Sequence, residues 1–156
     1  MKKEDKQKTA GVIAFPPLIY GAALAASLGA DYLLSRKPLP RATQALAVGF
    51  FIAAGMMVAP SFGAFRKAGT TVDVFEETTA LVETGPYEHT RNPIYIGLTS
   101  LYLAAAFASR RRTPLVVLPA ILWLMNAGVI EREERYLEAK FGKKYREYMQ
   151  RVPRWL

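Results

Sequence analysis

The sequence contains no cysteine and only one histidine, His89. Without cysteine the chain can form no disulfide, no thiolate metal site and no thiol nucleophile. One histidine among these neighbours cannot assemble a metal site, so we predict that no metal is bound. His89 is more typical of a solvated loop histidine, although an imidazole can also transfer a proton. The P-loop, G-x-G-x-x-G, H-E-x-x-H and G-x-S-x-G motifs are missing as well, which gives no support to a soluble nucleotide-binding architecture.

Charged residues are absent from four long stretches: Ala10–Ala30, Ala42–Phe65, Asn92–Ser109 and Thr113–Ile130. A bilayer core requires about 20 apolar residues in a helix, and about 17 at the least. The first two stretches meet this length comfortably and the last two narrowly. We therefore predict an all-α, polytopic membrane protein with about four transmembrane helices and a C-terminal amphipathic helix. The last two stretches could instead form a tilted or partly re-entrant hairpin.

A cleaved signal peptide is the alternative for the first stretch, because lysines precede it and small residues end it. Its apolar run is longer than the roughly 7–15 residues of a signal core, which favours a retained span. The whole chain has 156 residues, the length of one domain. We predict a single membrane domain, with two N-terminal spans in residues 1–65. Residues 66–156 would supply a cofactor-binding loop, a helical hairpin and the C-terminal helix.

The formal net charge of +8 raises the question of the partner. Basic residues that flank spans contact anionic headgroups, and this explanation is favoured over nucleic acid. With four spans both termini lie on one side. The first eight residues carry four lysines and the chain after Ile130 carries eight Lys or Arg, so we predict that this side is cytoplasmic, in an inner or plasma membrane. Basic residues in the two opposing loops, at 36–41 and 110–112, weaken that orientation. No feature indicates an oligomeric state.

The C-terminal part has the pattern of an amphipathic helix from Glu131 onward. Apolar residues recur there at spacings of four, four, three and four, in the order Leu137, Phe141, Tyr145, Tyr148 and Val152. Such a helix could lie on the headgroups or fold back over the loop formed by residues 66–91. A loop of this length in a small protein is more often functional than idle.

Two polar strings adjoin the ends of the apolar stretches. In the first, Tyr87, His89 and Arg91 follow a Gly-Pro turn and precede the third span, and Tyr95 lies one turn further in. Interfacial anchoring would explain Tyr87 or Arg91 singly, but it does not require Gly-Pro-Tyr and Arg-Asn-Pro at a fixed spacing.

The second string places Glu131, Glu133 and Glu134 at the end of the fourth span, where carboxylates oppose the dipole of a helix that ends there. They could form a solvated cluster with nearby arginines. Glu133 shares a helix face with Leu137, which favours an inward position for its side chain.

Together these strings resemble the integral-membrane methyltransferases that include isoprenylcysteine carboxyl methyltransferases and phospholipid N-methyltransferases. The resemblance covers about Thr71 to Trp155. It rests on Leu81-Val82 with Gly85-Pro86-Tyr87, on Arg91-Asn92-Pro93-Ile94-Tyr95-Ile96-Gly97, and on Glu133-Glu134-x-x-Leu137 followed by Phe141-Gly142, Tyr145, Tyr148 and Val152-Pro153-Arg154. The family often has histidine where this chain has Asn92, which keeps hydrogen-bonding capacity and loses titration.

The resemblance implies S-adenosylmethionine as the cofactor, held at the cytoplasmic face between the loop, the hairpin and the tail helix. The acceptor would be embedded in lipid, either an isoprenylcysteine-type carboxylate or a phospholipid amine. Tyrosine faces would stabilise the sulfonium cation and Glu133 would accept the ribose hydroxyls. Arg91 and Glu134 are the implied catalytic residues, and Glu134 or His89 could take a proton from an amine acceptor. The implied cofactor-binding residues are Leu81, Val82, Tyr87, Asn92, Pro93, Ile94, Tyr95 and Glu133.

Two other functions remain open at this point. Sterol reductases resemble this C-terminal arrangement but use NADPH, which would call for a basic cluster to hold the extra phosphate. The third interpretation is a non-enzymatic membrane scaffold or assembly factor whose site has decayed, although decay is opposed by the intact Tyr87, Arg91, Tyr95 and Glu133.

Overall fold

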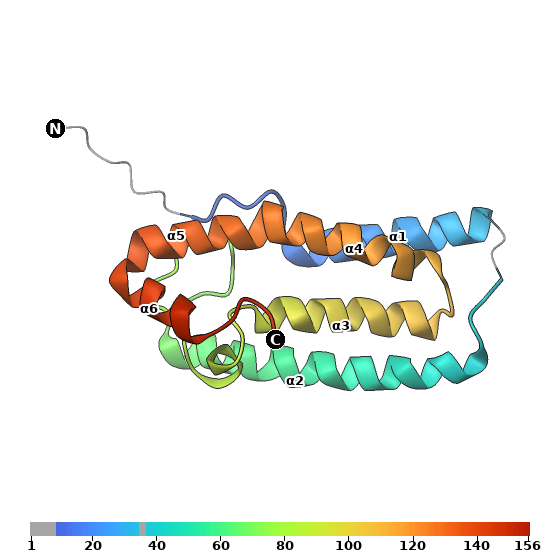
Figure 1. Cartoon of the computed structure of the whole chain (residues 1–156), viewed down its shortest axis with the longest axis horizontal. Coiled ribbons are helices and arrows are strands. Elements are labelled where there is room, and N and C mark those ends of the chain that lie inside the picture. The colour runs from blue at the N-terminus through green and yellow to red at the C-terminus, as the bar shows by residue number, and fades with distance from the viewer. Residues whose placement is uncertain (1–8, 35–36) are drawn as a thin grey trace.

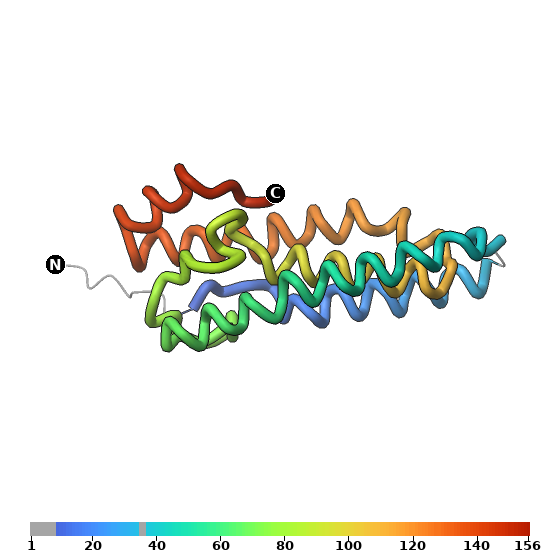
Figure 2. Tube along the Cα trace, turned by 90° about the horizontal axis from the view of Figure 1, so that it is seen from below, coloured from blue at the N-terminus to red at the C-terminus, as the bar shows by residue number. Residues whose placement is uncertain are grey.

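A computed structural model describes residues 9–34 and 37–156, which form helices and loops and contain no strand. This confirms the predicted all-α class. Four helices make up the body of the molecule: α1 (Pro16–Leu33), α2 (Gln44–Ala68), α3 (Pro93–Ala108) and α4 (Thr113–Met125). They run side by side along the long axis in both views (Figures 1 and 2). A single 3-10 turn, η1 (Arg41–Thr43), leads into α2.

The four helices pack as two pairs. α2 lies along α3, and α1 lies along α4 and also contacts α3 (Figure 1). Gly97 on α3 permits the closest approach to α2, because a Cβ atom there would overlap the side chain of Val58. Close contact through small residues is the usual way in which helices associate in lipid.

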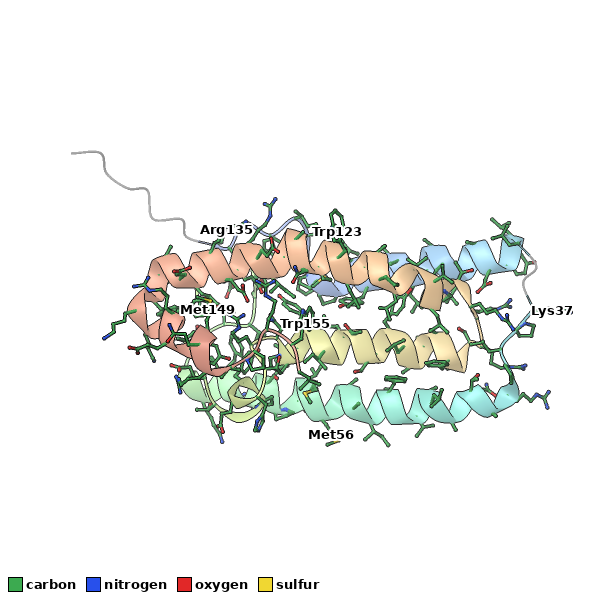
Figure 3. The ribbon with its side chains drawn as sticks, in the orientation of Figure 1. Lys37, Met56, Trp123, Arg135, Met149 and Trp155 are labelled. Atoms are coloured by element: carbon green, nitrogen blue, oxygen red, sulfur yellow. The ribbon has the colours of Figure 1, made fainter. Side chains whose placement is uncertain are left out.

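In the part of the chain that the structure describes, two helices are long and apolar enough to cross a membrane: Arg41–Ala68, and a continuous helix over Thr113–Phe141. The uncharged part of the second ends at Ile130, and the remainder lies outside that apolar run, because seven of the eleven residues of α5 (Glu131–Phe141) are charged. α3 is apolar but has only 16 residues. Met56 on α2 and Trp123 on α4 point outward from the bundle and are 66% and 71% exposed (Figure 3). Outward apolar side chains of this size suit contact with lipid.

The first helix starts later than the uncharged stretch suggests. α1 begins at Pro16, where a proline lacks only an N–H group that would have no helical partner. The residues before it lie against the segment that follows α4, at Gly128 and Arg132. The Ile13 N–H donates to the Gly128 carbonyl at 3.3 Å, and Arg132 Nη1 donates to the Gly11 carbonyl at 2.9 Å.

The predicted single C-terminal helix is wrong. α4 continues through a π-helical turn, η3 (Asn126–Ile130), into α5, but α5 ends at Phe141 and a separate helix α6 (Lys143–Arg151) turns back. Gly142 makes the corner with φ 55° and ψ −122°, a conformation that glycine adopts readily and L side chains do not. The corner lets the apolar stripe be buried instead of lying along a straight helix. Its residues Tyr145, Tyr148 and Val152 pack against Leu81 of the loop.

The loop between α2 and α3 lies at the same end of the bundle as α5 and α6 (Figure 1). It contains one 3-10 turn, η2 (Gly85–Glu88). We call the end of the bundle that holds this loop, α5 and α6 the loop end. Of the two positions predicted for the tail, folding back over the loop is therefore the one observed. The four N-terminal lysines and Arg36, on which part of the predicted orientation depends, lie outside the described residues.

Candidate functional site

The loop end encloses a cavity of about 530 Å³, within the range of roughly 300–1,000 Å³ that small-molecule sites occupy. Tyr87 from the first polar string and Glu133 from the second both line it. The lining residues come from the N-terminal segment, α1, α2, the loop, α3, α5 and α6: Ala10, Phe15, Pro16, Pro17, Val58, Phe62, Phe65, Thr71, Val72, Asp73, Val74, Glu76, Thr78, Ala80, Leu81, Val82, Tyr87, Arg91, Asn92, Ile94, Tyr95, Leu98, Glu133, Tyr136, Leu137, Tyr145 and Tyr148.

Glu133 is an acidic residue of the cavity wall and is hydrogen-bonded to a side chain of another helix. The Tyr95 hydroxyl on α3 donates to Glu133 Oε1 at 2.6 Å, which links the two polar strings directly. Burial among the cavity walls raises the pKa of Glu133 to about 7, the Tyr95 hydrogen bond opposes that shift, and the charge of Glu134 adds to it. The carboxylate can therefore change its charge near neutral pH, and a cation in the cavity would favour the ionised form.

Tyrosines from four elements, η2, α3, α5 and α6, line the cavity. The Tyr87 ring packs edge-on against Phe65 of α2, with 5.6 Å between ring centroids. The Tyr148 hydroxyl on α6 donates to the Tyr87 carbonyl at 2.8 Å and so fastens α6 to η2. Burial raises the pKa of Tyr87, Tyr145 and Tyr148, so all three are neutral phenols at physiological pH.

Arg91 supplies a guanidinium group to the same cavity. Its Nη2 atom lies 3.2 Å from Glu134 Oε1, whereas Nε and Nη1 are buried and have no hydrogen-bond partner among the described residues. Burying donors of a charged group without a partner is costly. An anionic group of a ligand would supply the missing partner.

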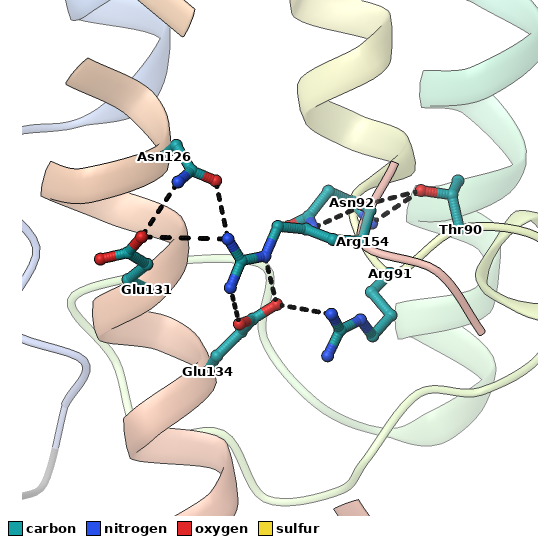
Figure 4. Close-up of polar contacts among 7 residues, drawn as sticks. All are labelled: Thr90, Arg91, Asn92, Asn126, Glu131, Glu134 and Arg154. Atoms are coloured by element: carbon teal, nitrogen blue, oxygen red, sulfur yellow. Dashed lines mark hydrogen bonds and ion pairs between the residues drawn. The ribbon is translucent and has the colours of Figure 1, made fainter. Parts of the chain in front are cut away.

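Glu134 and Arg154 form an ion pair behind Arg91 (Figure 4). Arg154 Nε lies 3.0 Å from Glu134 Oε1, and its Nη2 lies 2.5 Å from Oε2. Glu134 does not line the cavity, and both of its oxygens contact arginines. Glu134 therefore lies against Arg91 and Arg154, outside the residues that line the cavity.

The remaining predicted residues divide into two groups. Leu81, Val82 and Ile94 line the cavity beside Tyr87 and Glu133. Pro93 is buried at the start of α3 without lining it, and His89 is exposed and also outside it.

Asn92 lines the cavity while its Nδ2 atom donates to the Arg154 carbonyl at 2.9 Å. Its contact is therefore with the C-terminal tail.

Sequence reasoning assigned no site role to Tyr145, Tyr148 or Arg154. The two tyrosines entered only as part of the amphipathic stripe and of the C-terminal family signature, and their place in the cavity follows the corner at Gly142. Nothing in the local sequence around Arg154 reveals that the tail returns to Glu134.

A second cavity of about 530 Å³ lies between α1, α2 and α3 and shares Pro17 and Leu98 with the first. Its lining is almost entirely apolar: Pro17, Tyr20, Gly21, Leu24, Ala47, Val48, Phe51, Leu98, Leu101, Tyr102, Ala104, Ala105 and Ala108. An apolar chain could therefore lie beside the polar cavity without leaving the bundle.

The sequence profile of the phospholipid methyltransferase family matches residues 42–144. The chain belongs to this family. The match covers α2, the loop, α3, α4 and α5, which include the two polar strings that line the cavity. The predicted resemblance to membrane methyltransferases is confirmed. The family and the two apolar helices together indicate a membrane protein, and the family favours a methyltransferase over a reductase.

Two curated proteins are similar to parts of the chain. Protein-S-isoprenylcysteine O-methyltransferase B of Arabidopsis thaliana is 33% identical over 78 residues, which are 50% of this chain and 40% of that protein. An uncharacterized protein of Haemophilus influenzae is 58% identical over 33 residues, 21% of this chain and 52% of that protein. The chain thus spans about half, or less, of the curated relatives that it matches. No solved structure matches.

Proposed function

We propose that the protein transfers a methyl group from S-adenosylmethionine to a lipid or lipidated acceptor, either an isoprenylcysteine-type carboxylate or a phospholipid amine. The observation that carries this proposal is the cavity at the loop end. It joins Tyr87 and Glu133, which are far apart in the sequence, in a chain of the phospholipid methyltransferase family.

The residues of the cavity fit the cofactor. Glu133 offers carboxylate oxygens to the ribose hydroxyls, and Leu81 and Val82 provide an apolar wall for adenine. The faces of Tyr87 and Tyr95 suit a sulfonium cation. When bound, S-adenosylmethionine supplies the electrophilic methyl group, so the protein has mainly to align the partners and exclude water.

Other residues hold this arrangement in place. Asn92 and Pro93 fix the start of α3, from which Ile94 and Tyr95 reach the cavity. Arg91 would hold an oxyanion of the bound molecules through the guanidinium N–H groups that have no partner within residues 9–34 and 37–156. Glu134 would act by orienting Arg91.

The apolar cavity would take the lipid chain of the acceptor, because it adjoins the polar cavity at Pro17 and Leu98. In this arrangement α1 to α4 cross the membrane as four spans and the loop end lies at the cytoplasmic face. The chain then acts as one membrane domain, in which residues 1–65 contribute to the apolar cavity for the acceptor and residues 66–156 hold the cofactor.

NADPH fits the cavity less well. Among the described residues that line it, Arg91 is the only basic one, while Asp73, Glu76 and Glu133 are acidic. A phosphate-bearing dinucleotide needs several cations, whereas an acidic lining suits the cationic methyl donor.

Titration calorimetry on the detergent-solubilised protein tests the proposal. The wild type should bind S-adenosylmethionine and S-adenosylhomocysteine and should not bind NADPH. Glu133→Gln should weaken S-adenosylhomocysteine binding by roughly 10- to 100-fold, because hydrogen bonds to a charged group are worth about 1.5–3 kcal/mol.

Glu138→Gln is the matched control, since Glu138 lies on the same helix, pairs with Arg146 and does not line the cavity. Unchanged affinity in Glu133→Gln would remove that residue from the site. Binding of NADPH alone would overturn the proposed function.

A further inference from the structure

We propose that Arg154 is a positioning residue for Arg91. Arg154 binds both carboxylate oxygens of Glu134. Glu134 therefore does not bind the guanidinium N–H groups with which Arg91 contacts an oxyanion of the bound ligand. This inference rests on the proposed function, because it assumes that the cavity at the loop end holds such a ligand.

The contacts of the Arg154 side chain support the assignment (Figure 4). Arg154 meets both carboxylate oxygens of Glu134, at 3.0 and 2.5 Å, and its Nη1 donates to Asn126 Oδ1 at 3.0 Å. Asn126 Nδ2 in turn donates to Glu131 Oε1 at 3.0 Å. The guanidinium group is thus fixed on three of its nitrogens by the π-helical turn and α5.

The backbone of the tail is attached separately. The Arg154 carbonyl accepts hydrogen bonds from Thr90 Oγ1 at 3.1 Å and Asn92 Nδ2 at 2.9 Å, and the Pro153 carbonyl accepts one from the Arg91 N–H at 2.9 Å. These bonds use main-chain atoms of the tail. A substitution of the Arg154 side chain therefore leaves these tail bonds in place and removes the contacts of the guanidinium group with Glu134, Asn126 and Glu131.

The charges explain why Arg154 matters to Arg91. A carboxylate prefers a two-pronged contact with one guanidinium group. Arg154 takes both oxygens of Glu134, so Arg91 makes only the 3.2 Å contact through Nη2. Without Arg154, a two-pronged contact between Glu134 and Arg91 would use Nε or Nη1. Those are the two nitrogens without a partner among the described residues.

The oxyanion could come from two sources: the amino-acid carboxylate of the cofactor, or the carboxylate or phosphate of the acceptor. Calorimetry with S-adenosylhomocysteine and with 5′-methylthioadenosine distinguishes the first source, because the second compound lacks the carboxylate. Initial rates with S-adenosylmethionine, measured on S-farnesyl-N-acetylcysteine and on phosphatidylethanolamine vesicles, report on the acceptor.

The variants are Arg154→Gln, Glu134→Gln and the double substitution, all in the full chain. Arg151→Gln is the control, since Arg151 is exposed on α6 and pairs with Glu83. Arg154→Gln should lower S-adenosylhomocysteine affinity, or raise the acceptor KM, by tenfold or more. The double variant should stay within threefold of Glu134→Gln and should be less impaired than Arg154→Gln, because a neutral residue 134 no longer captures Arg91. Arg151→Gln should stay within twofold of the wild type.

If Arg154 only stabilises the fold, the losses caused by the two single substitutions should add in the double variant. The inference is overturned if the double variant is as impaired as Arg154→Gln or worse, or if Arg154→Gln changes neither affinity nor KM. If Arg154→Gln does not fold, Arg154→Lys takes its place. Its loss of affinity, or its rise in acceptor KM, should be smaller than that expected for Arg154→Gln, and adding Glu134→Gln should remove it. If the wild type binds no S-adenosylhomocysteine, the proposed function itself is wrong. If the wild type binds it but adding Glu134→Gln does not restore the Arg154→Gln variant, only the role of Arg154 is wrong.

Discussion

Glu133 and Tyr95 make the contact on which the proposed cofactor site depends. The 2.6 Å hydrogen bond joins α3 to α5, and burial raises the pKa of Glu133 to about 7. An acceptor of ribose hydroxyls must be ionised to bind them strongly. The shift therefore places cofactor binding under the control of pH.

Affinity for S-adenosylhomocysteine should fall as the pH is lowered through about 7, by roughly tenfold per pH unit below that value, because protonation removes the acceptor charge. Calorimetry across this range measures the effect. The pH dependence should vanish in Glu133→Gln. The stability of the ligand-free protein should change in the opposite sense. A raised carboxyl pKa contributes stability at low pH that is lost as the pH rises through about 7.

Tyr95→Phe should move the midpoint of that pH dependence upward. The Tyr95 hydroxyl stabilises the ionised carboxylate, and losing a hydrogen bond to a charged group costs about 1.5 kcal/mol or more, which corresponds to about one pH unit. A midpoint that stays in place or moves downward would show that the hydroxyl does not support the charged form of Glu133.

At the residue scale the sequence predicted much of the cavity lining, including Tyr87, Arg91 and Glu133. It also predicted an inward position for Glu133, which lines the cavity, but it gave no sign that the adjacent Glu134 would lie outside the cavity lining. Glu134 instead makes one contact with Arg91 of the loop and another with Arg154, which returns from the tail. Both are tertiary contacts, which the local sequence pattern does not predict.

At the scale of elements, the C-terminal helix shows the limit of periodicity. The apolar stripe predicted which residues are buried, and the structure buries Tyr145, Tyr148 and Val152. The stripe continues across Gly142 as if the helix were unbroken, so spacing alone cannot reveal the corner. Only the backbone conformation at Gly142 shows that the last helix turns back over the loop.

The contact between α2 and α3 should be sensitive to the size of residue 97. Gly97→Val should lower the free energy of unfolding by about 1–3 kcal/mol or more, because the added atoms overlap Val58 and force the helices apart. Gly49→Val is the control, since a Cβ at Gly49 meets nothing within 4 Å. Melting temperatures in detergent compare the two. Equal melting temperatures would contradict the close approach at Gly97.

At the scale of the whole molecule, the sequence predicted the helical class and the family, but the number of spans rests on length alone. Two helices meet the criteria for spanning, whereas α3 has 16 residues and is short. A short helix can still cross where the bilayer is thin or flanking residues reach the interface. Its role therefore depends on its neighbours and not on its own sequence.

The absence of cysteine makes the proposed four-span arrangement directly testable. Single cysteines at His89 and Lys143 should react with a membrane-impermeant maleimide from one face. Cysteines at Lys37 and Ser109 should react from the other, because these exposed positions lie at opposite ends of the bundle. Labelling with intact and opened cells measures this. Reaction of all four positions from the same face would contradict the arrangement.

The central claim is that the loop and the start of α5 enclose one S-adenosylmethionine site. Photolabelling with an azido-adenine analogue of S-adenosylmethionine, followed by peptide mapping, tests it most directly. The account predicts label within residues 71–95 or 131–148, and loss of that label when S-adenosylhomocysteine competes. Competable label confined to the opposite end of the bundle, around residues 37–43 or 109–116, would contradict it.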